Sequence, residues 1–200
     1  LMLRGVASEV FPGQTLVAQI EARNITKAEL RLIPLHTDAV AHYWASTSPD
    51  YQQWLQQQKR GKVQKWLVRP LQKPPYALQK DSIRFSLSQP GIYLLQLRTN
   101  DKLLEQTTIV CSRVKTICTT LPDASVRLQI VDAESGHPMA GEIVLYKQNG
   151  QKIASQSSDK HGALRIQAAQ ARQTMAFAQI AGDHFSAPVR LHYYSKKKKK

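Results

Sequence analysis

Apolar and polar residues alternate with a period of two along most of this 200-residue chain, and this alternation restricts its fold more than any other feature. The segment 15–22 is the clearest case, because every second residue is apolar: Leu16, Ala18, Ile20 and Ala22. Alternation of this kind turns one face of a β-strand to a core and the other face to water. The pattern returns at 28–32, 83–87 and 92–98, with turn residues between the runs. We therefore predict an all-β fold.

The second half of the chain shows the same alternation in shorter segments. Strands are predicted there at 114–119, 125–132, 142–148, 151–157, 163–168, 173–180 and 185–193. Asn149-Gly150 separates two of them and is typical of a two-residue β-hairpin turn. Short strands separated by turns indicate a β-sandwich. We expect two tandem immunoglobulin-like β-sandwiches, a first domain at 1–111 and a second at 112–195.

The segment 36–75 departs from the alternation and is predicted to be an insertion in the first sandwich. Ser48 is a typical helix N-cap and Pro49 suits the first helical position. We therefore expect a helix that passes through Leu55 and ends before Gly61, followed by a strand at 62–68. The first sandwich would then carry a helical insertion.

The formal net charge is +14, but the lysine run at 196–200 supplies five of these charges. We interpret this run as a poly-lysine tail, disordered or of artificial origin, without information about the fold. The remaining 23 basic and 14 acidic residues are spread over both halves of the chain. Such mild basicity does not by itself predict a nucleic-acid partner. No apolar stretch approaches the roughly 18 residues of a membrane span, so a soluble chain is expected.

One stretch in the second half carries a known motif. It comprises Val131-Asp132, Ser135-Gly136, Pro138, Gly141 and 142–146, and a turn at 158–162 follows. The order resembles a pattern shared by transthyretin-like and carboxypeptidase-regulatory-like β-sandwiches and by the macroglobulin domains of bacterial alpha-2-macroglobulins.

The residues of this motif have readable physical roles. Gly141 is expected to allow a β-bulge. After it, either Ile143 with Leu145 or Val144 with Tyr146 fills the core, since both pairs are apolar and alternate.

The first half of the chain favours one of these groups, the bacterial alpha-2-macroglobulins. Its segments 10–14, 23–25, 30–35, 75–76 and 82–95 resemble an N-terminal macroglobulin domain of the Bacteroides-type alpha-2-macroglobulins. The similarity covers most of residues 5–146. It implies a fold of two macroglobulin-type β-sandwiches.

This resemblance implies a function as well. The family traps proteases after cleavage of a bait region, and many members carry a thioester in a Cys-x-Glu-Gln motif. Here the corresponding stretch is Leu103-Leu104-Glu105-Gln106, and without a cysteine no thioester can form. The chain is therefore expected to be a non-catalytic scaffold part of a broad-spectrum protease inhibitor. The implied partners are other domains of the parent chain and, through the full-length protein, target proteases.

The resemblance further implies an extracytoplasmic location, periplasmic or at the cell surface. A membrane attachment would come only from a lipid anchor outside this fragment. Surface adhesion or glycan binding is the alternative function, because similar sandwiches occur in adhesive and polysaccharide-handling proteins.

The sequence predicts no enzyme, no cofactor and no metal site. The six histidines form no ligand pair, and no nucleophile elbow is present. The turn residues Asp132, Asp159 and Asp183 lack calcium-loop spacing and are explained by hydrogen bonds to their own turns. Cys111 and Cys118 form either a disulfide or two buried thiols, and extended strands favour the thiols.

One patch of the insertion combines aromatic and basic side chains and is the candidate ligand site. It comprises Trp54, Lys59, Arg60, Lys62, Lys65, Trp66 and Arg69. Such a patch can stack on glycans or, as a weaker hypothesis, on nucleic-acid bases, although no nucleic acid is the expected partner. The favoured interpretation is that the tryptophans anchor the insertion on the sandwich while the basic residues face solvent.

Overall fold

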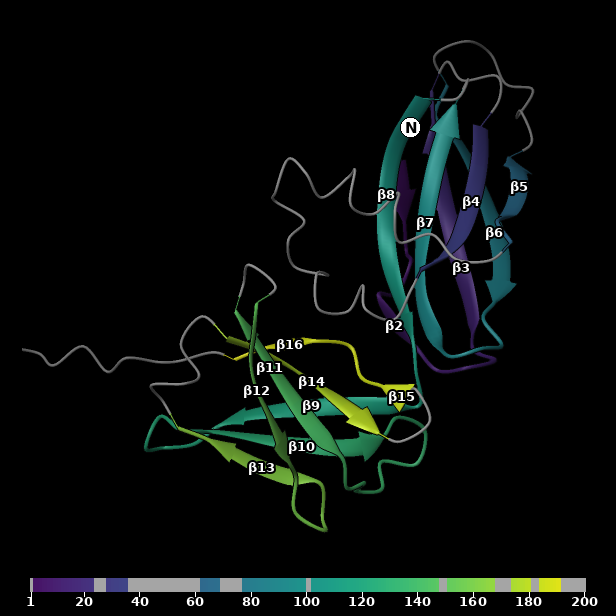
Figure 1. The fold of residues 1–200 in the computed structure, drawn as a ribbon. Coiled ribbons are helices and arrows are strands. Elements are labelled where there is room, and N and C mark those ends of the chain that lie inside the picture. Colours follow the sequence, from purple (N-terminus) through teal and green to yellow (C-terminus); the bar gives the residue numbers. More distant parts are fainter. Residues whose placement is uncertain are drawn as a thin grey trace, which may run out of the picture. The chain divides into compact units, whose positions relative to one another are not determined.

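The structure, a computed structural model, describes residues 2–23, 28–35, 62–68, 77–99, 102–147, 151–167, 174–180 and 184–191. Within these ranges the regular elements are all β-strands, which confirms the predicted all-β class. The described residues fall into two compact units, one made of residues up to Cys111 and one of residues from Ser112 onward (Figure 1). The predicted helix from Ser48 and the lysine tail at 196–200 lie outside the described residues.

The first unit is a sandwich of two sheets. Its strands are β1 (Met2–Arg4), β2 (Glu9–Val10), β3 (Thr15–Ala22), β4 (Ala28–Leu35), β5 (Gln64–Val68), β6 (Gln79–Ser86), β7 (Gly91–Thr99) and β8 (Lys102–Cys111). One sheet has the order β1-β3-β6 and the other the order β2-β8-β7-β4-β5. All neighbours are antiparallel except β2 and β8, which are parallel.

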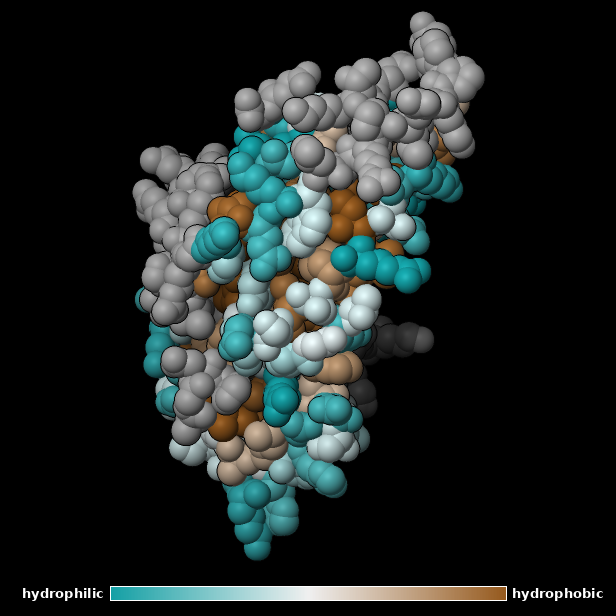
Figure 2. Space-filling model, turned by 90° about the vertical axis from the view of Figure 1, so that its right-hand side faces the viewer, coloured by the Kyte–Doolittle hydropathy of each residue, from teal (hydrophilic) through white to brown (hydrophobic). Residues whose placement is uncertain are grey.

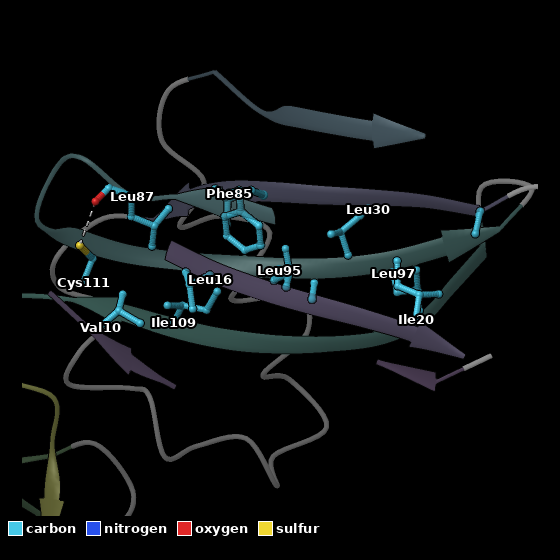
Figure 3. Close-up of a cluster of buried hydrophobic side chains, with 13 residues drawn as sticks. Val10, Leu16, Ile20, Leu30, Phe85, Leu87, Leu95, Leu97, Ile109 and Cys111 are labelled. Atoms are coloured by element: carbon cyan, nitrogen blue, oxygen red, sulfur yellow. Dashed lines mark hydrogen bonds between the residues drawn. The ribbon is translucent and has the colours of Figure 1, made fainter. Parts of the chain in front are cut away.

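The core of the first unit lies between these two sheets (Figure 3). The alternation predicted it well, since Leu16, Ala18 and Ile20 of β3 are at most 3% exposed. Ala22, expected on the same face, is only half-buried. Other strands contribute Leu30, Leu32, Phe85, Leu95, Leu97 and Ile109.

The second unit is also built from two sheets. Its strands are β9 (Val114–Thr120), β10 (Val126–Asp132), β11 (Glu142–Lys147), β12 (Lys152–Ser157), β13 (Ala163–Ile166), β14 (Thr174–Ile180), β15 (His184–Phe185) and β16 (Val189–Arg190). One sheet has the order β13-β10-β9, and the other has β12-β11-β14-β15 with β16 also paired to β14. All these neighbours are antiparallel.

The strand predicted at 185–193 is instead two short strands, β15 and β16. Ser186 lies between them, and its hydroxyl accepts a hydrogen bond from the Ala178 N–H of β14 at 2.9 Å. Pro188 has no N–H to donate to a strand partner. The interruption follows from these two residues, which the alternation of apolar residues did not reveal.

The core of the second unit decides between the two residue pairs of β11. Ile143 and Leu145 are 0% and 1% exposed and belong to the core between the sheets. Val144 and Tyr146 lie on the opposite face, where Tyr146 stacks on Phe177 with 5.4 Å between ring centroids. Both faces of β11 are therefore apolar at this point.

Candidate functional site

The structure describes three members of the predicted aromatic and basic patch: Lys62, Lys65 and Trp66. Trp54, Lys59, Arg60 and Arg69 lie outside the described residues. Trp66 is half-buried in β5, opposite Leu30 of β4, and packs against the core of the first unit. Its ring centroid is 5.3 Å from that of Phe85, with 35° between the planes. The patch as a ligand site stays a prediction.

Lys65 belongs to a charged group on the outer face of the five-stranded sheet. It lies opposite Arg31 of β4, and Arg31 donates a hydrogen bond to the Glu29 carboxylate. This bond, with the charges of Arg31, Lys65 and Arg98, lowers the pKa of Glu29 against the effect of desolvation. The cations around Glu29 thus stabilise its charged form.

The segment Leu103-Leu104-Glu105-Gln106, compared above with the thioester motif, is part of strand β8. The Glu105 carboxylate accepts a hydrogen bond from the Leu3 N–H at 2.6 Å, which ties β1 to β8. Gln106 accepts one from the Gln96 amide at 3.0 Å. Leu103 replaces the cysteine that a thioester would require. These residues therefore act in strand pairing.

Neither Cys111 nor Cys118 forms a disulfide, which confirms that part of the prediction of two buried thiols. Only Cys111 is buried, whereas Cys118 is half-buried. Cys111 is 0% exposed, and its Sγ donates to the Leu87 carbonyl at 3.7 Å (Figure 3). Burial raises the pKa of the Cys111 thiol to about 11. A thiol that is buried and protonated is a poor nucleophile and a poor metal ligand.

Asp132 organises the first turn of the sequence motif. Its Oδ1 accepts hydrogen bonds from the Ser135 N–H at 2.7 Å, the Ser135 hydroxyl at 2.9 Å and the Glu134 N–H at 3.1 Å. Bonds to the charged carboxylate lower the pKa of Asp132, with the Ser135 N–H as the largest cause. The prediction that Asp132 serves its own turn is confirmed.

Asp159 has the same role in the second turn. Its Oδ1 accepts from the Ala163 N–H at 2.8 Å and the His161 N–H at 2.9 Å. The bond from Ala163 is the largest cause of a lowered Asp159 pKa. The prediction is therefore confirmed for Asp159 too, whereas Asp183 lies outside the described residues.

The glycine of this second turn allows a close approach of two chain segments. Gly162 has a φ of +73°, and a Cβ built there would lie 2.3 Å from the Met139 carbonyl oxygen and 2.7 Å from that of Ile130. Its own carbonyl accepts from the Ile130 N–H at 2.9 Å. Gly162 thus closes the turn onto β10.

The expected bulge at Gly141 was wrong. The register of β11 against β12 shifts between Leu145 and Tyr146 instead. Gly141 is needed for a different reason, because a Cβ there would lie 2.9 Å from the Gln179 carbonyl oxygen.

The described residues hold no group of three or more histidine, cysteine, aspartate or glutamate side chains placed to bind a metal. Within the same ranges no helix is long and apolar enough to cross a membrane. In the view of Figure 2, apolar side chains appear as small patches between hydrophilic ones. The molecule is a tandem β-sandwich protein.

No family model and no curated protein matches this chain. Solved structures do. An Escherichia coli alpha-2-macroglobulin structure spanning domains MG0-NIE-MG1 matches 93% of this chain with a TM-score of 0.72 and 14% identity, and the chain spans 62% of it. A structure of domains NIE-MG1 matches 94% of this chain and 95% of its own length, with a TM-score of 0.65 and 16% identity.

A Salmonella alpha-2-macroglobulin reacted with methylamine matches 95% of this chain with a TM-score of 0.64 and 14% identity. This chain spans only 12% of that protein. The chain therefore has the fold of bacterial alpha-2-macroglobulin domains, and the predicted resemblance is confirmed at that level.

Proposed function

We propose that this chain supplies two non-catalytic structural domains to an alpha-2-macroglobulin-like protease inhibitor. The observation that carries the proposal is the match to the two-domain NIE-MG1 structure, which is nearly complete for both chains. A shared tandem arrangement is more specific than a single sandwich, because many unrelated proteins contain single sandwiches.

The domain assignment follows from the order of the two units. The first domain, 1–111, would stand where NIE stands in the E. coli protein, and the second, 112–195, where MG1 stands. The sequence motif with Asp132, Gly141 and Gly162 falls in the second domain, which is consistent with this assignment.

Two observations on the described residues support a scaffold role. Leu103 excludes a thioester at the Glu105-Gln106 step, and the Cys111 thiol is buried with a raised pKa. The chain would position the working parts of the parent protein. Its partners would be the neighbouring domains and, through the whole inhibitor, proteases encountered outside the cytoplasm.

Glycan binding has less support from the described residues. It would need exposed aromatic rings that stack on sugars, and Trp66 packs against Phe85 instead. Surface adhesion without a glycan ligand has no specific observation in its favour.

The test is to express the complete gene product that contains this chain and to incubate it with trypsin. A trapping inhibitor would block hydrolysis of casein, which is too large to reach an enclosed protease, but not of a small peptide substrate. The isolated 200-residue chain should block neither. Undiminished casein hydrolysis with the complete product, or inhibition by the isolated chain, would contradict the proposal.

A further inference from the structure

The outer face of the three-stranded sheet β13-β10-β9 in the second unit has an unusual composition. Alternate residues of these strands point away from the core and form cross-strand rows. Arg127 of β10 lies between Thr119 of β9 and Arg165 of β13. In the next row Gln129 lies between Ile117 and Ala163. We call the surface formed by Lys115, Ile117, Arg127, Gln129 and Arg165 the basic face.

Every charged residue of the basic face is positive. Lys115, Arg127 and Arg165 are exposed, and Arg127 is directly opposite Arg165 in the ladder. Like charges in directly opposite positions destabilise a sheet. The fold therefore tolerates a local repulsion on this face.

The corresponding face of the first unit is arranged differently. On the sheet β1-β3-β6, Glu21 lies between two cations, 3.2 Å from Arg4 and 3.3 Å from Lys80. Glu21 thus pairs with two cations of that face, whereas Arg84, opposite Val17, is exposed. The comparison shows that an outer sheet face in this protein does not have to be uniformly positive.

The carboxylates nearest to the basic face have other bonds. Asp123 pairs with Arg165, but it also accepts hydrogen bonds from the Ser125 N–H and hydroxyl, and the Arg165 side chain remains 54% exposed. The Arg127 guanidinium donates to the neutral Gln129 amide oxygen at 3.1 Å. Asp159 is close enough for the Arg127 charge to help lower its pKa, but its Oδ1 is bonded to the N–H groups of its own turn. Among the described residues, no carboxylate lies within salt-bridge distance of Arg127 or Lys115. Two of the three cations thus keep their ability to pair with an added anion.

An apolar side chain lies among these cations. Ile117 is 44% exposed, between Lys115 and Thr119 on β9. Arg127 lies in the neighbouring row of the ladder. An exposed apolar residue with an arginine nearby is a composition found at protein interfaces, where arginine is enriched. Sites for single-stranded nucleic acid, by contrast, combine cations with aromatic rings on which bases stack, and the basic face has no aromatic ring.

We propose that the basic face binds an acidic segment of a partner polypeptide. Its carboxylates pair with Arg127 and Lys115, and an apolar side chain between them covers Ile117. A second copy of this chain is a poor partner, because the net charge of +14 makes two copies repel one another. The inference stands on the charges of this surface and does not depend on the proposed inhibitor function.

The test uses the complete 200-residue chain, labelled with ¹⁵N, and the probe peptide Glu-Glu-Leu-Glu-Glu. Amide shifts are expected to concentrate on β9, β10 and β13. The variant Arg127→Glu should raise the Kd at least about tenfold, which corresponds to about 1.4 kcal/mol. A peptide with serine in place of leucine should bind the parent chain more weakly than the leucine peptide does. The variant Ile117→Ser should bind the two peptides equally well.

Matched controls separate specific binding from general attraction. Lys152→Glu introduces the same charge change as Arg127→Glu at another exposed position of the second unit, and it should leave the Kd within about twofold. Dispersed ¹⁵N spectra would establish that each variant is folded. The proposal is wrong if Lys152→Glu weakens binding as much as Arg127→Glu, if shifts follow all exposed lysines and arginines, or if oligo-dT binds this face more tightly than the peptide.

Discussion

The indole ring of Trp66 lies 5.3 Å from the phenyl ring of Phe85, centroid to centroid, so an edge strand of one sheet contacts an edge strand of the other. Trp66 comes from β5 and Phe85 from β6. The ring pair closes one side of the first sandwich. Its contribution to stability can be measured directly.

Trp66→Ala is expected to lower the free energy of unfolding by about 2 kcal/mol, because it removes apolar burial from a half-buried ring. Lys65→Ala changes an exposed neighbour on the same strand and should change stability by less than about 0.5 kcal/mol. Urea denaturation of both variants provides the measurement. Equal losses would show that the ring pair does not hold the two edges together.

Gly162→Ala should destabilise the second unit by more than about 3 kcal/mol or prevent its folding. The added Cβ would meet backbone carbonyl oxygens at 2.3 and 2.7 Å, which flexible side chains cannot relieve. Gly136→Ala is the matched control, because Gly136 has nearly the same φ of +72° with no atom within 4 Å of the added Cβ. Its cost should be only about 1 kcal/mol. The stability of the two variants can be compared by thermal unfolding. Similar losses of stability would contradict the steric explanation.

Ala124→Gly should stabilise the second unit. Ala124 has a φ of +66°, a left-handed conformation that costs an L-residue about 1 kcal/mol and glycine almost nothing. The greater entropy of glycine in the unfolded chain offsets part of this relief, so we expect the free energy of unfolding to rise by about 0.5 kcal/mol. Ala163→Gly, inside β13, should instead destabilise. A loss of stability in Ala124→Gly would show that the turn does not strain this residue.

Cys111 should resist a thiol reagent such as Ellman's reagent at pH 8 in the folded protein. Its pKa is raised to about 11, so the reactive thiolate is scarce, and its 0% exposure blocks access. Both cysteines should react once the protein is unfolded in urea. Counting thiols with Cys111→Ala and Cys118→Ala separates the two sites, and rapid labelling of Cys111 in folded protein would contradict the observed packing.

Stability should fall as the pH drops below about 4. The folded-state pKa values of Asp123, Asp132 and Asp159 lie below the ordinary 3.8, because turn N–H groups and hydroxyls bond their carboxylates. A depressed folded pKa contributes stability above the unfolded value, and that contribution is lost as the pH falls through the folded pKa. Asp159→Asn keeps an acceptor oxygen without the charge. It should be less stable at pH 7 and should lose less stability between pH 7 and pH 3, as measured by Tm.

Much of the fold follows from local sequence alone. Alternating residues placed Leu16, Ala18 and Ile20 in the core, and the turn aspartates were identified by their spacing and type. These features are local, because a period of two separates the faces of a strand and a short polar side chain reaches the N–H groups of its own turn. The absence of a cysteine at Leu103 was likewise readable without a structure.

Other features depended on the tertiary structure. Ile143 and Leu145, rather than Val144 and Tyr146, face the core, and alternation cannot choose between two apolar faces. Gly141 and Gly162 are required by carbonyl groups that are distant in sequence or on another strand. The basic face arises because strand register brings Arg127 opposite Arg165 and sets Ile117 one row away. Pairing between distant strands is a property of the whole chain, and it decides which residues meet on a surface.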